Sequence, residues 1–238
     1  MAQQKPKAKQ KKVAVVTGAN RGLGLEACRQ LGHAGYRVIL TARGKAKGER
    51  AAAGLRGDGL DVTFRQLDVT DAASARRLAR FVAKGKRLDV LINNAAILLD
   101  GEEGTGEVKP QILTRTIETN VGGPLRVAQA LAPLMERGGR IVNVSSGAGQ
   151  FKNLSAHWPA YGISKAALNA LTKTLAADLK DRGIKVNAVC PGWVRTDMGG
   201  PKADLSVAEG ADTIVWLASA APGRLTGRFF RKRKEIDW

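Results

Sequence analysis

The alternation of short apolar runs with longer segments of helical period is the feature that most constrains the fold of this chain. From Val13 onward, six runs rich in Val and Ile predict strands: "KVAVVT", "RVILTA", "VTFRQLDV", "LDVLINN", "GRIVNVSS" and "IKVNAVC". The run "GRFF" is a candidate last strand. Strands that alternate with helices build βαβ units and a parallel sheet. The sequence therefore predicts a single-domain α/β fold, with a doubly wound parallel sheet of about seven strands and helices on both faces.

The segments between these strands have the length and periodicity of helices. We expect helices at residues 22–34, 45–57, 71–84, 108–136, 158–182 and 206–219. Residues 108–136 form one long helix or a bent one, because Pro124 and Pro133 interrupt the segment. No linker or internal repeat is visible, so we predict one domain over residues 12–238, preceded by a flexible basic tail at 1–11.

The composition excludes several classes of protein. Hydrophobic residues make up 44% of the 238 residues and charged residues 25%, which is typical of globular domains and not of disordered chains. No apolar run approaches the roughly 18 residues of a membrane helix. The N-terminal "MAQQKPKAKQKK" lacks the apolar core of a secretory signal, so we expect a cytoplasmic protein without membrane insertion. Cys28 and Cys190 lack CxxC spacing, which argues against a disulfide framework or a zinc site, and we predict no metal.

The formal net charge of +18 raises the question of a polyanionic partner. Half of the excess lies at the two ends, within residues 1–12 and 224–237. The remainder is interspersed with acids, and no aromatic and basic motif accompanies it. We therefore favour a solvated basic surface and do not expect nucleic acid as a partner, while a polyanion contact through the basic ends stays open as the alternative.

The first strand runs into a glycine-rich turn, "TGANRGLG", which opens the first helix. Free backbone N–H groups at a helix N-terminus bind phosphate, and Gly18, Gly22 and Gly24 would let a pyrophosphate approach closely. The spacing is GxxxGxG and not the GxGxxG of the common dinucleotide fingerprint. With its strand and helix, the turn predicts a Rossmann-type dinucleotide site.

Two arginines beside this turn predict which dinucleotide binds. Arg43 ends the second strand, where folds that prefer NAD place an acid for the ribose 2′-hydroxyl. Arg21 lies inside the glycine turn, and a guanidinium matches the geometry of a phosphate. The pair therefore favours NADP(H) over NAD(H).

Polar residues follow the next two strands as well. Asp68 could accept a hydrogen bond from an adenine amino group, with the backbone of Val69 beside it, or it could be a helix N-cap. Asn93 and Asn94 end the fourth strand, where their amides can bond neighbouring backbone and hold the loop under the cofactor.

Tyr161 and Lys165, in "YGISK", lie four residues apart and hence on one helix face. A nearby ammonium lowers the pKa of a phenol, which would make Tyr161 a usable general acid or base. Ser146 at the end of the fifth strand and Asn120 in the helical region before it accompany the pair. Ligands of open α/β sheets bind at the carboxyl ends of the strands, so these groups are expected to converge.

In these motifs the chain resembles the short-chain dehydrogenase/reductase family across residues 12–238. The matching motifs are "TGANRGLG", "NNAA", "TNV", "SS", "YGISK" and "PGWVRT". The resemblance implies Asn120, Ser146, Tyr161 and Lys165 as the catalytic tetrad, with Ser145 as a neighbour of no catalytic role. The "LTAR", "FRQLDVTD" and "GRFFRKRKEIDW" segments are similar to the carbonyl-reductase-like branch, which uses NADPH.

The resemblance also implies a reaction. Ser146 would donate a hydrogen bond to a substrate carbonyl and Tyr161 would deliver a proton, with Lys165 on the nicotinamide ribose and Asn120 reaching Lys165 through water. Thr196 and the backbone of Val194 would anchor the carboxamide. The residues expected around the cofactor are Gly18, Asn20, Arg21, Gly22, Leu23, Gly24, Arg43, Asp68, Val69, Asn94, Ala95, Tyr161, Lys165, Pro191, Gly192, Val194 and Thr196.

Substrate selection is expected from segments 97–106, 147–158 and 193–204. His157 and Trp193 are substrate candidates alongside Ser146 and Tyr161, and Trp158 is a candidate for the pocket or for packing.

The sequence departs from the family pattern in two places. Ala96 stands where the family usually has glycine, which alters packing beside the cofactor. The long insertion of monomeric animal carbonyl reductases between the serine and the tyrosine is absent. Residues 108–136 and 158–182 are thus free to pair between subunits, and a homodimer or homotetramer is expected.

We therefore expect NADPH-dependent reduction of a small-molecule carbonyl: a ketone, an aldehyde or a quinone. Reduction of a 3-oxoacyl thioester on an acidic acyl carrier is a second possibility. A protein that senses NADP or binds a polyanion without turnover is a third, and the complete tetrad argues against it.

Overall fold

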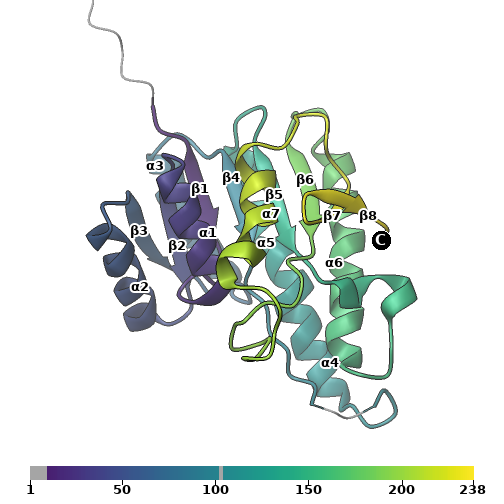
Figure 1. Ribbon diagram of the computed structural model, residues 1–238. Coiled ribbons are helices and arrows are strands. Elements are labelled where there is room, and N and C mark those ends of the chain that lie inside the picture. Colours follow the sequence, from purple (N-terminus) through teal and green to yellow (C-terminus); the bar gives the residue numbers. More distant parts are fainter. Residues whose placement is uncertain (1–9, 102–103) are drawn as a thin grey trace, which may run out of the picture.

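The computed structural model describes residues 10–101 and 104–238, and its centre is an eight-stranded sheet in the order β3-β2-β1-β4-β5-β6-β7-β8 (Figure 1). Most of the predicted basic tail, residues 1–9, lies outside the described residues, as does 102–103 in the predicted loop 97–106. The strands are β1 Val13–Val16, β2 Arg37–Ala42, β3 Val62–Gln66, β4 Val90–Asn93, β5 Arg140–Val144, β6 Lys185–Val189, β7 Phe229–Arg231 and β8 Lys234–Ile236. The first seven strands are parallel, which confirms the predicted doubly wound α/β fold.

The eighth strand was not predicted. β8 pairs antiparallel with β7 through a two-residue turn at Lys232 and Arg233, both with positive φ, at 49° and 59°. Turns of this kind match the twist of a hairpin and usually contain Asn or Gly. Lys232 and Arg233 take the place of Asn or Gly in this turn. The sequence pattern therefore does not indicate the hairpin.

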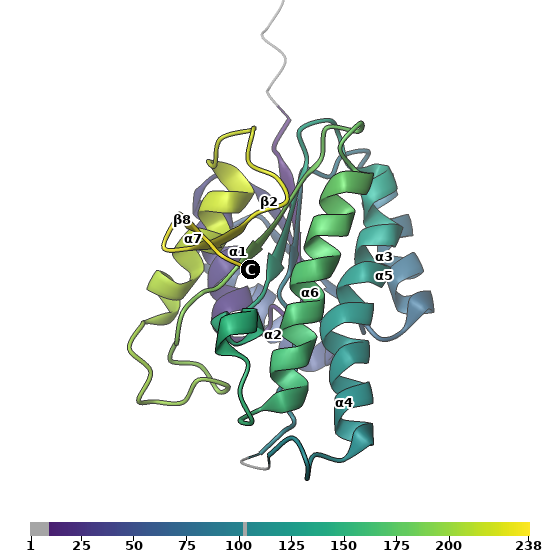
Figure 2. The same ribbon diagram turned by 90° about the vertical axis from the view of Figure 1, so that its right-hand side faces the viewer.

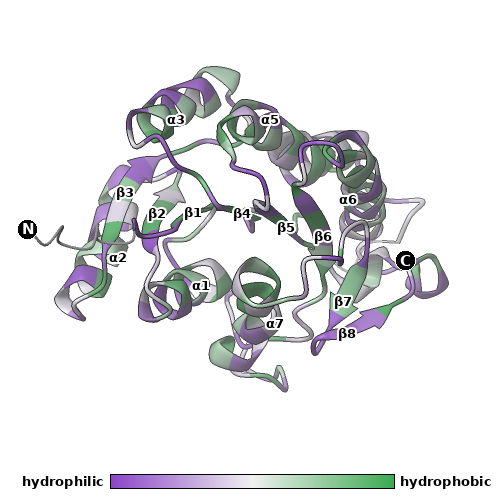
Figure 3. Cartoon of the chain, turned by 90° about the horizontal axis from the view of Figure 1, so that it is seen from above, coloured by the Kyte–Doolittle hydropathy of each residue, from purple (hydrophilic) through white to green (hydrophobic). Residues whose placement is uncertain are grey.

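Helices cover both faces of the sheet. Viewed from above, α3, α5 and α6 lie on one side and α1, α2 and α7 on the other (Figure 3). The helices are α1 Gly22–His33, α2 Lys45–Gly57, α3 Ala72–Lys84, α4 Pro110–Ile117, α5 Gly123–Leu131, α6 Pro159–Asp178 and α7 Val207–Ser219. None of the helices in the described part of the chain is both long and apolar enough to cross a membrane.

The segment predicted as one long or bent helix at 108–136 is helical from Pro110 to Leu134, in four consecutive segments. A π-helical turn, Glu118–Gly122, joins α4 to α5, and a short 3-10 turn at Ala132–Leu134 ends the run. Pro124 lies in the first turn of α5, where its missing N–H is tolerated. The π-helical turn contains Asn120, which is buried.

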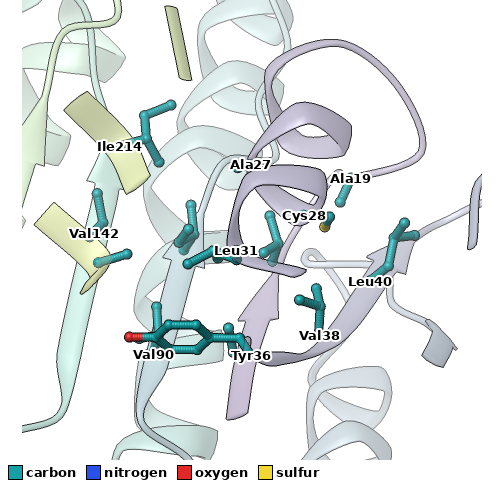
Figure 4. Close-up of a cluster of buried hydrophobic side chains, with 14 of the residues drawn as sticks. Ala19, Ala27, Cys28, Leu31, Tyr36, Val38, Leu40, Val90, Val142 and Ile214 are labelled. Atoms are coloured by element: carbon teal, nitrogen blue, oxygen red, sulfur yellow. The ribbon is translucent and has the colours of Figure 1, made fainter. Parts of the chain in front are cut away.

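Each face of the sheet has its own apolar core. On one face, Leu31 of α1 and Ile214 of α7 pack onto the strands, with Val38 and Val142 in the same cluster (Figure 4). On the other face, Leu131 of α5 belongs to a second cluster. The sheet is therefore buried on both sides, as its nearly continuous apolar strands predict. Both cysteines are free and buried, Cys28 in the first cluster.

Two glycines of α2 allow a matched test of this packing. A Cβ at Gly48 would lie 2.0 Å from the ring of buried Phe64 on β3, whereas a Cβ at Gly54 would meet nothing within 4 Å. Gly54→Ala is expected to raise the free energy of unfolding by up to about 1 kcal/mol, because alanine favours helix. Gly48→Ala should lower it by about 1 to 3 kcal/mol, because overpacking displaces the ring. Urea unfolding measures both, and equal stabilisation by the two changes would contradict the packing at Phe64.

Candidate active site

The carboxyl ends of the central strands open onto one cleft of about 880 Å³. This is the edge at which ligands of doubly wound sheets bind. The predicted residues that line it are Gly18, Asn20, Arg21, Gly22, Leu23, Arg43, Asp68, Val69, Asn94, Ala95, Ser146, Tyr161, Lys165, Pro191, Gly192, Trp193, Val194 and Thr196. Three predicted residues, Gly24, Asn120 and His157, do not line it. Trp158, left open between pocket and packing, does.

The glycine turn between β1 and α1 is held by the loop after β4. Gly18 and Gly22 have positive φ, at 62° and 56°. The amide of Asn94 donates to the carbonyls of Thr17 and Gly18 at 2.9 and 3.0 Å. A Cβ at Gly24 would lie 2.5 Å from that same amide nitrogen. Gly24 therefore packs closely beneath the turn, where a side chain would clash with Asn94. Because it lies beneath the turn, Gly24 does not line the cleft.

The N-terminus of α1 fits a phosphate group. Its N-cap, Arg21, makes no side-chain capping bond, and the first turn of the helix contains no acid. The backbone N–H groups at this end are thus not capped by a side chain of the N-cap residue, and a helix N-terminus favours an anion. The residues present are compatible with the pyrophosphate of a dinucleotide.

The two arginines next to the turn differ in their surroundings. Arg43 follows β2, is exposed, and makes no side-chain ion pair with any residue that the structure describes. Arg21 forms an ion pair with Asp197, which belongs to the segment after β6. A ligand phosphate would compete with Asp197 for Arg21, whereas Arg43 is available without such competition.

Asp68 lines the cleft but does not cap a helix. Its carboxyl accepts hydrogen bonds from the backbone N–H and the hydroxyl of Thr70, at 2.9 and 2.7 Å. The N-cap of α3 is Asp71, which accepts from the N–H of Ala73 at 2.8 Å. The N-cap alternative for Asp68 is therefore wrong, because α3 begins further along the chain, at Ala72.

Tyr161 and Lys165 of α6 lie side by side beneath the cleft. Lys165 Nζ is 5.4 Å from the centroid of the Tyr161 ring and donates to the carbonyl of Val144 at 2.8 Å. Their exposed fractions are only 9% and 2%. The carbonyl at the end of β5 thus anchors the ammonium under the phenol.

Burial dominates the protonation of both groups. It raises the pKa of Tyr161 to about 12, against a smaller lowering by a hydrogen bond with Ser146. The expectation of a lowered Tyr161 pKa is wrong for the chain by itself, because desolvation of the phenolate outweighs the nearby ammonium. Burial also lowers the pKa of Lys165 to about 8, since the ammonium too is removed from water. A protonated phenol is suited to donate a proton.

The two serines after β5 have different surroundings. The Ser146 side chain accepts from the N–H of Ala148 at 3.2 Å. Ser145 is buried, and its hydroxyl donates to the backbone carbonyl of Lys165 at 3.3 Å. Ser145 is thus tied to the α6 backbone, while Ser146 is the serine whose interaction with the phenol lowers the pKa of Tyr161.

Asn120 lies behind the cleft, not in its wall. Its amide exchanges two hydrogen bonds with the backbone of Ile97, at 2.8 and 2.9 Å, and donates to the hydroxyl of Ser164 at 3.0 Å. Asn120 therefore contacts the residue next to Lys165, and its water-mediated link to Lys165 stays a prediction.

The outer part of the cleft is partly apolar. Trp193 and Trp158 are 51% and 49% exposed, and Met198 lies near Trp193 in the chain. His157 is exposed outside the cleft wall, so the structure gives no support to its substrate role. Sequence reasoning missed Arg115 of α4, which lines the cleft. Periodicity predicts that a segment forms a helix. It does not indicate which residue of that helix lines a cleft formed with neighbouring elements.

The raised Tyr161 pKa has a consequence for stability. The unfolded chain releases the phenol proton near the ordinary pKa of 10, whereas the folded chain holds it until about 12. This contribution is fully present below pH 10 and is lost as the pH rises to about 12. In a Tyr36→Phe background, the chain with Tyr161 should lose on the order of 2 kcal/mol relative to Tyr161→Phe over that window.

Urea unfolding across the window measures the loss. Tyr36→Phe is needed because the chain has two tyrosines and the pKa of Tyr36 is raised as well. Parallel stability curves for the two proteins would contradict the burial of the phenol.

Comparisons with known proteins agree with this architecture. The family model described as short chain dehydrogenase matches residues 12–205. A relative named carbonyl reductase (NADPH) 1, from Oryctolagus cuniculus, is 36% identical and aligns with 96% of this chain and 99% of its own. A solved variant of a short-chain dehydrogenase/reductase from Serratia marcescens superposes with a TM-score of 0.85 at 31% identity, over 92% of this chain and 95% of its own. A solved variant of the actinorhodin polyketide ketoreductase with NADPH gives 0.81 at 30%, over 92% and 94%. Since sequence and fold agree over nearly the whole length of each relative, the chain belongs to the short-chain dehydrogenase family.

Proposed function

We propose that the protein reduces a ketone, aldehyde or quinone to an alcohol with NADPH, and that Tyr161 is the proton donor. The observation that carries the proposal is the buried phenol of Tyr161, protonated at neutral pH, which shares with Ser146 the base of a cleft whose other half fits a dinucleotide. The relative named as an NADPH carbonyl reductase supports the same reaction and cofactor.

The cofactor would extend along the carboxyl edge of the sheet. The glycine turn and the N-terminus of α1 would hold the pyrophosphate, and Arg43 would hold the 2′-phosphate, with Arg21 as a second guanidinium. Asp68 and the backbone of Val69 line the same cleft and would recognise the adenine. When bound, NADPH supplies the hydride that is transferred to the substrate carbon.

The nicotinamide half is expected at the ends of β4, β5 and β6. Lys165 would hold the ribose hydroxyls, while Thr196 and the backbone of Val194 would hold the carboxamide. Gly192 turns the chain at this point, with a φ of 87°. A Cβ at Gly192 would lie 2.6 Å from Leu205, so this turn requires glycine.

Proton transfer follows from the surroundings of the tyrosine. The hydroxyl of Ser146 donates to the carbonyl oxygen of the substrate and polarises it. As the oxygen gains negative charge, Tyr161 gives it the phenol proton, which completes the alcohol. The resulting phenolate is buried, and the ammonium of Lys165 is the positive charge placed to stabilise it, 5.4 Å from the ring centroid.

Reduction of a 3-oxoacyl thioester is the second candidate. The similarity to a structure of a polyketide ketoreductase favours it, and the basic surface suits an acidic carrier. A protein that binds NADP without turnover is the third candidate. Such a protein would not need a proton donor beside Ser146. Turnover with ketones, quinones and acyl thioesters separates the three.

Assembly and location remain predictions. Figure 2 shows α4, α5 and α6 on one side of the molecule, the region expected to pair in a homodimer or homotetramer. The alignment with the rabbit protein spans 276 positions, more than the 238 residues of this chain, so that relative contains residues this chain lacks. The cytoplasm is the proposed location.

Removal of the proton donor tests the mechanism. Tyr161→Phe is expected to lower kcat for NADPH-dependent ketone reduction by about 10²- to 10⁴-fold, the range for loss of a general acid. Ser146→Ala should also lower kcat strongly, whereas Ser145→Ala should have a much smaller effect. NADPH oxidation is followed by absorbance. Equal rates in Tyr161→Phe and wild type would refute the proposed mechanism.

A charge reversal tests the 2′-phosphate site. Arg43→Asp should raise KM for NADPH at least about tenfold more than KM for NADH, because one charged hydrogen bond contributes about 1.5 to 3 kcal/mol. The matched control is Arg80→Asp on α3, an exposed arginine outside the cleft, which changes the net charge equally. An unchanged ratio of the two KM values in Arg43→Asp would remove Arg43 from the site.

A further inference from the structure

The helix that contains the tyrosine begins without a cap of its own. The N-cap of α6 is Trp158, whose backbone is left-handed, at φ 49° and ψ 54°, and whose side chain makes no capping bond. Pro159 follows and has no N–H. The first intrahelical bond runs from the N–H of Gly162 to the carbonyl of Trp158. The N–H of Tyr161 therefore depends on a partner from outside the helix.

That partner is Asp100, in the segment after β4. Its Oδ2 accepts from the N–H of Tyr161 at 3.0 Å, across 61 positions of sequence. The side chain is buried, with only 4% exposed. Asp100 thus does for α6 what an N-cap residue does for an ordinary helix, and it does so at the residue proposed to donate the proton.

The backbone of Tyr161 is held on its other side as well. The hydroxyl of Ser164 donates to the carbonyl of Tyr161 at 2.7 Å and accepts from the amide of Asn120 at 3.0 Å. The same amide of Asn120 bonds the backbone of Ile97, three residues before Asp100. The bonds form a closed circuit, from Asn120 through the 97–100 segment to Tyr161 and back through Ser164.

Stability alone is a poor explanation for this acid. Asp100 Oδ1 is buried and has no hydrogen-bond partner among the described residues. A buried polar atom without a partner destabilises the folded state. An apolar side chain would avoid this cost but would leave the N–H of Tyr161 without its partner. What the carboxyl provides is a defined position for the N–H of Tyr161.

We propose that Asp100 is a positioning residue, which places the phenol of Tyr161 against Ser146 and the substrate carbonyl by holding the backbone of Tyr161. The inference rests on the proposed role of Tyr161 as proton donor. Leu98 and Leu99 of the same segment line the cleft, so Asp100 also links the substrate wall to the proton donor. Displacement of a reacting group by about 1 Å can lower a rate by up to about a hundredfold.

The test compares variants that keep or remove the acceptor oxygen. Asp100→Asn retains an oxygen for the Tyr161 N–H, and its kcat at saturating NADPH should stay within about threefold of wild type. Asp100→Ala removes the oxygen, and its kcat should fall at least about tenfold. The NADPH dissociation constant, measured by fluorescence, should change little in either. Asp100→Leu fills the space without an acceptor, so it replaces the alanine variant if that chain does not fold.

A second cap serves as the matched control. Asp71→Ala removes the cap of α3 and should lower the thermal midpoint without lowering kcat of the folded protein. If Asp100→Ala and Asp100→Leu behave like Asp71→Ala, Asp100 is structural only and the proposal is wrong. A loss of kcat in Asp100→Asn as large as that in Asp100→Ala would also overturn the proposal. It would show that the acceptor oxygen at position 100 does not determine kcat.

A spectroscopic measurement does not depend on turnover. In a Tyr36→Phe background Tyr161 is the only tyrosine, and its ionisation appears as tyrosinate absorbance in the near ultraviolet. Asp100→Ala should shift this ionisation to lower pH, because the released ring gains water, whereas Asp100→Asn should shift it less. Identical titrations in wild type and Asp100→Ala would overturn the proposal. If no carbonyl is reduced by wild type, the proposed function fails, and the titration still decides the role of Asp100.

Discussion

The hydrogen bond from Lys165 to the carbonyl of Val144 is the contact on which the site depends. It joins the second turn of α6 to the last residue of β5, and the hydroxyl of Ser145 returns a bond from the end of β5 to the backbone of Lys165. Helix and strand are thus linked in both directions at the carboxyl edge of the sheet. The phenol of Tyr161 and the side chain of Ser146 meet because their backbones are held there. The ammonium of Lys165 is buried in this position, and its burial lowers its pKa.

Burial has opposite effects on the two titratable groups, and both effects favour the neutral form. The phenol of Tyr161 holds its proton more tightly than in water, and the ammonium of Lys165 holds its proton less tightly. The phenol at the base of the cleft is therefore protonated at neutral pH, as the proposed proton donor must be. In the proposed reaction the phenolate would lie beside the ammonium of Lys165, 5.4 Å from the ring centroid. The same pair, in water, would have far less influence on each other, because solvent screens the charges.

Much of the site could be predicted because its residues lie next to strand ends. Gly18, Asn94, Ser146 and Val194 each follow a different strand, and parallel strands bring their carboxyl ends to one edge. The π-helical turn around Asn120, the hairpin at Lys232 and the bond from Asp100 to Tyr161 could not be predicted in this way. The first two lack the residues that usually signal such turns. The third joins positions 61 residues apart, and nothing in the local sequence of either one indicates the other.

The sequence by itself determined the doubly wound sheet, the glycine turn and the register of Tyr161 and Lys165 on one helix face. These follow from periodicity and local spacing, which act over a few residues. Only the tertiary structure decided the protonation of the pair, because desolvation depends on what packs around a group and not on its neighbours in the chain. It also decided that Arg21 is shared with Asp197 and that α6 is capped by Asp100. In each case the two partners lie far apart in the sequence, and only the fold brings them into contact.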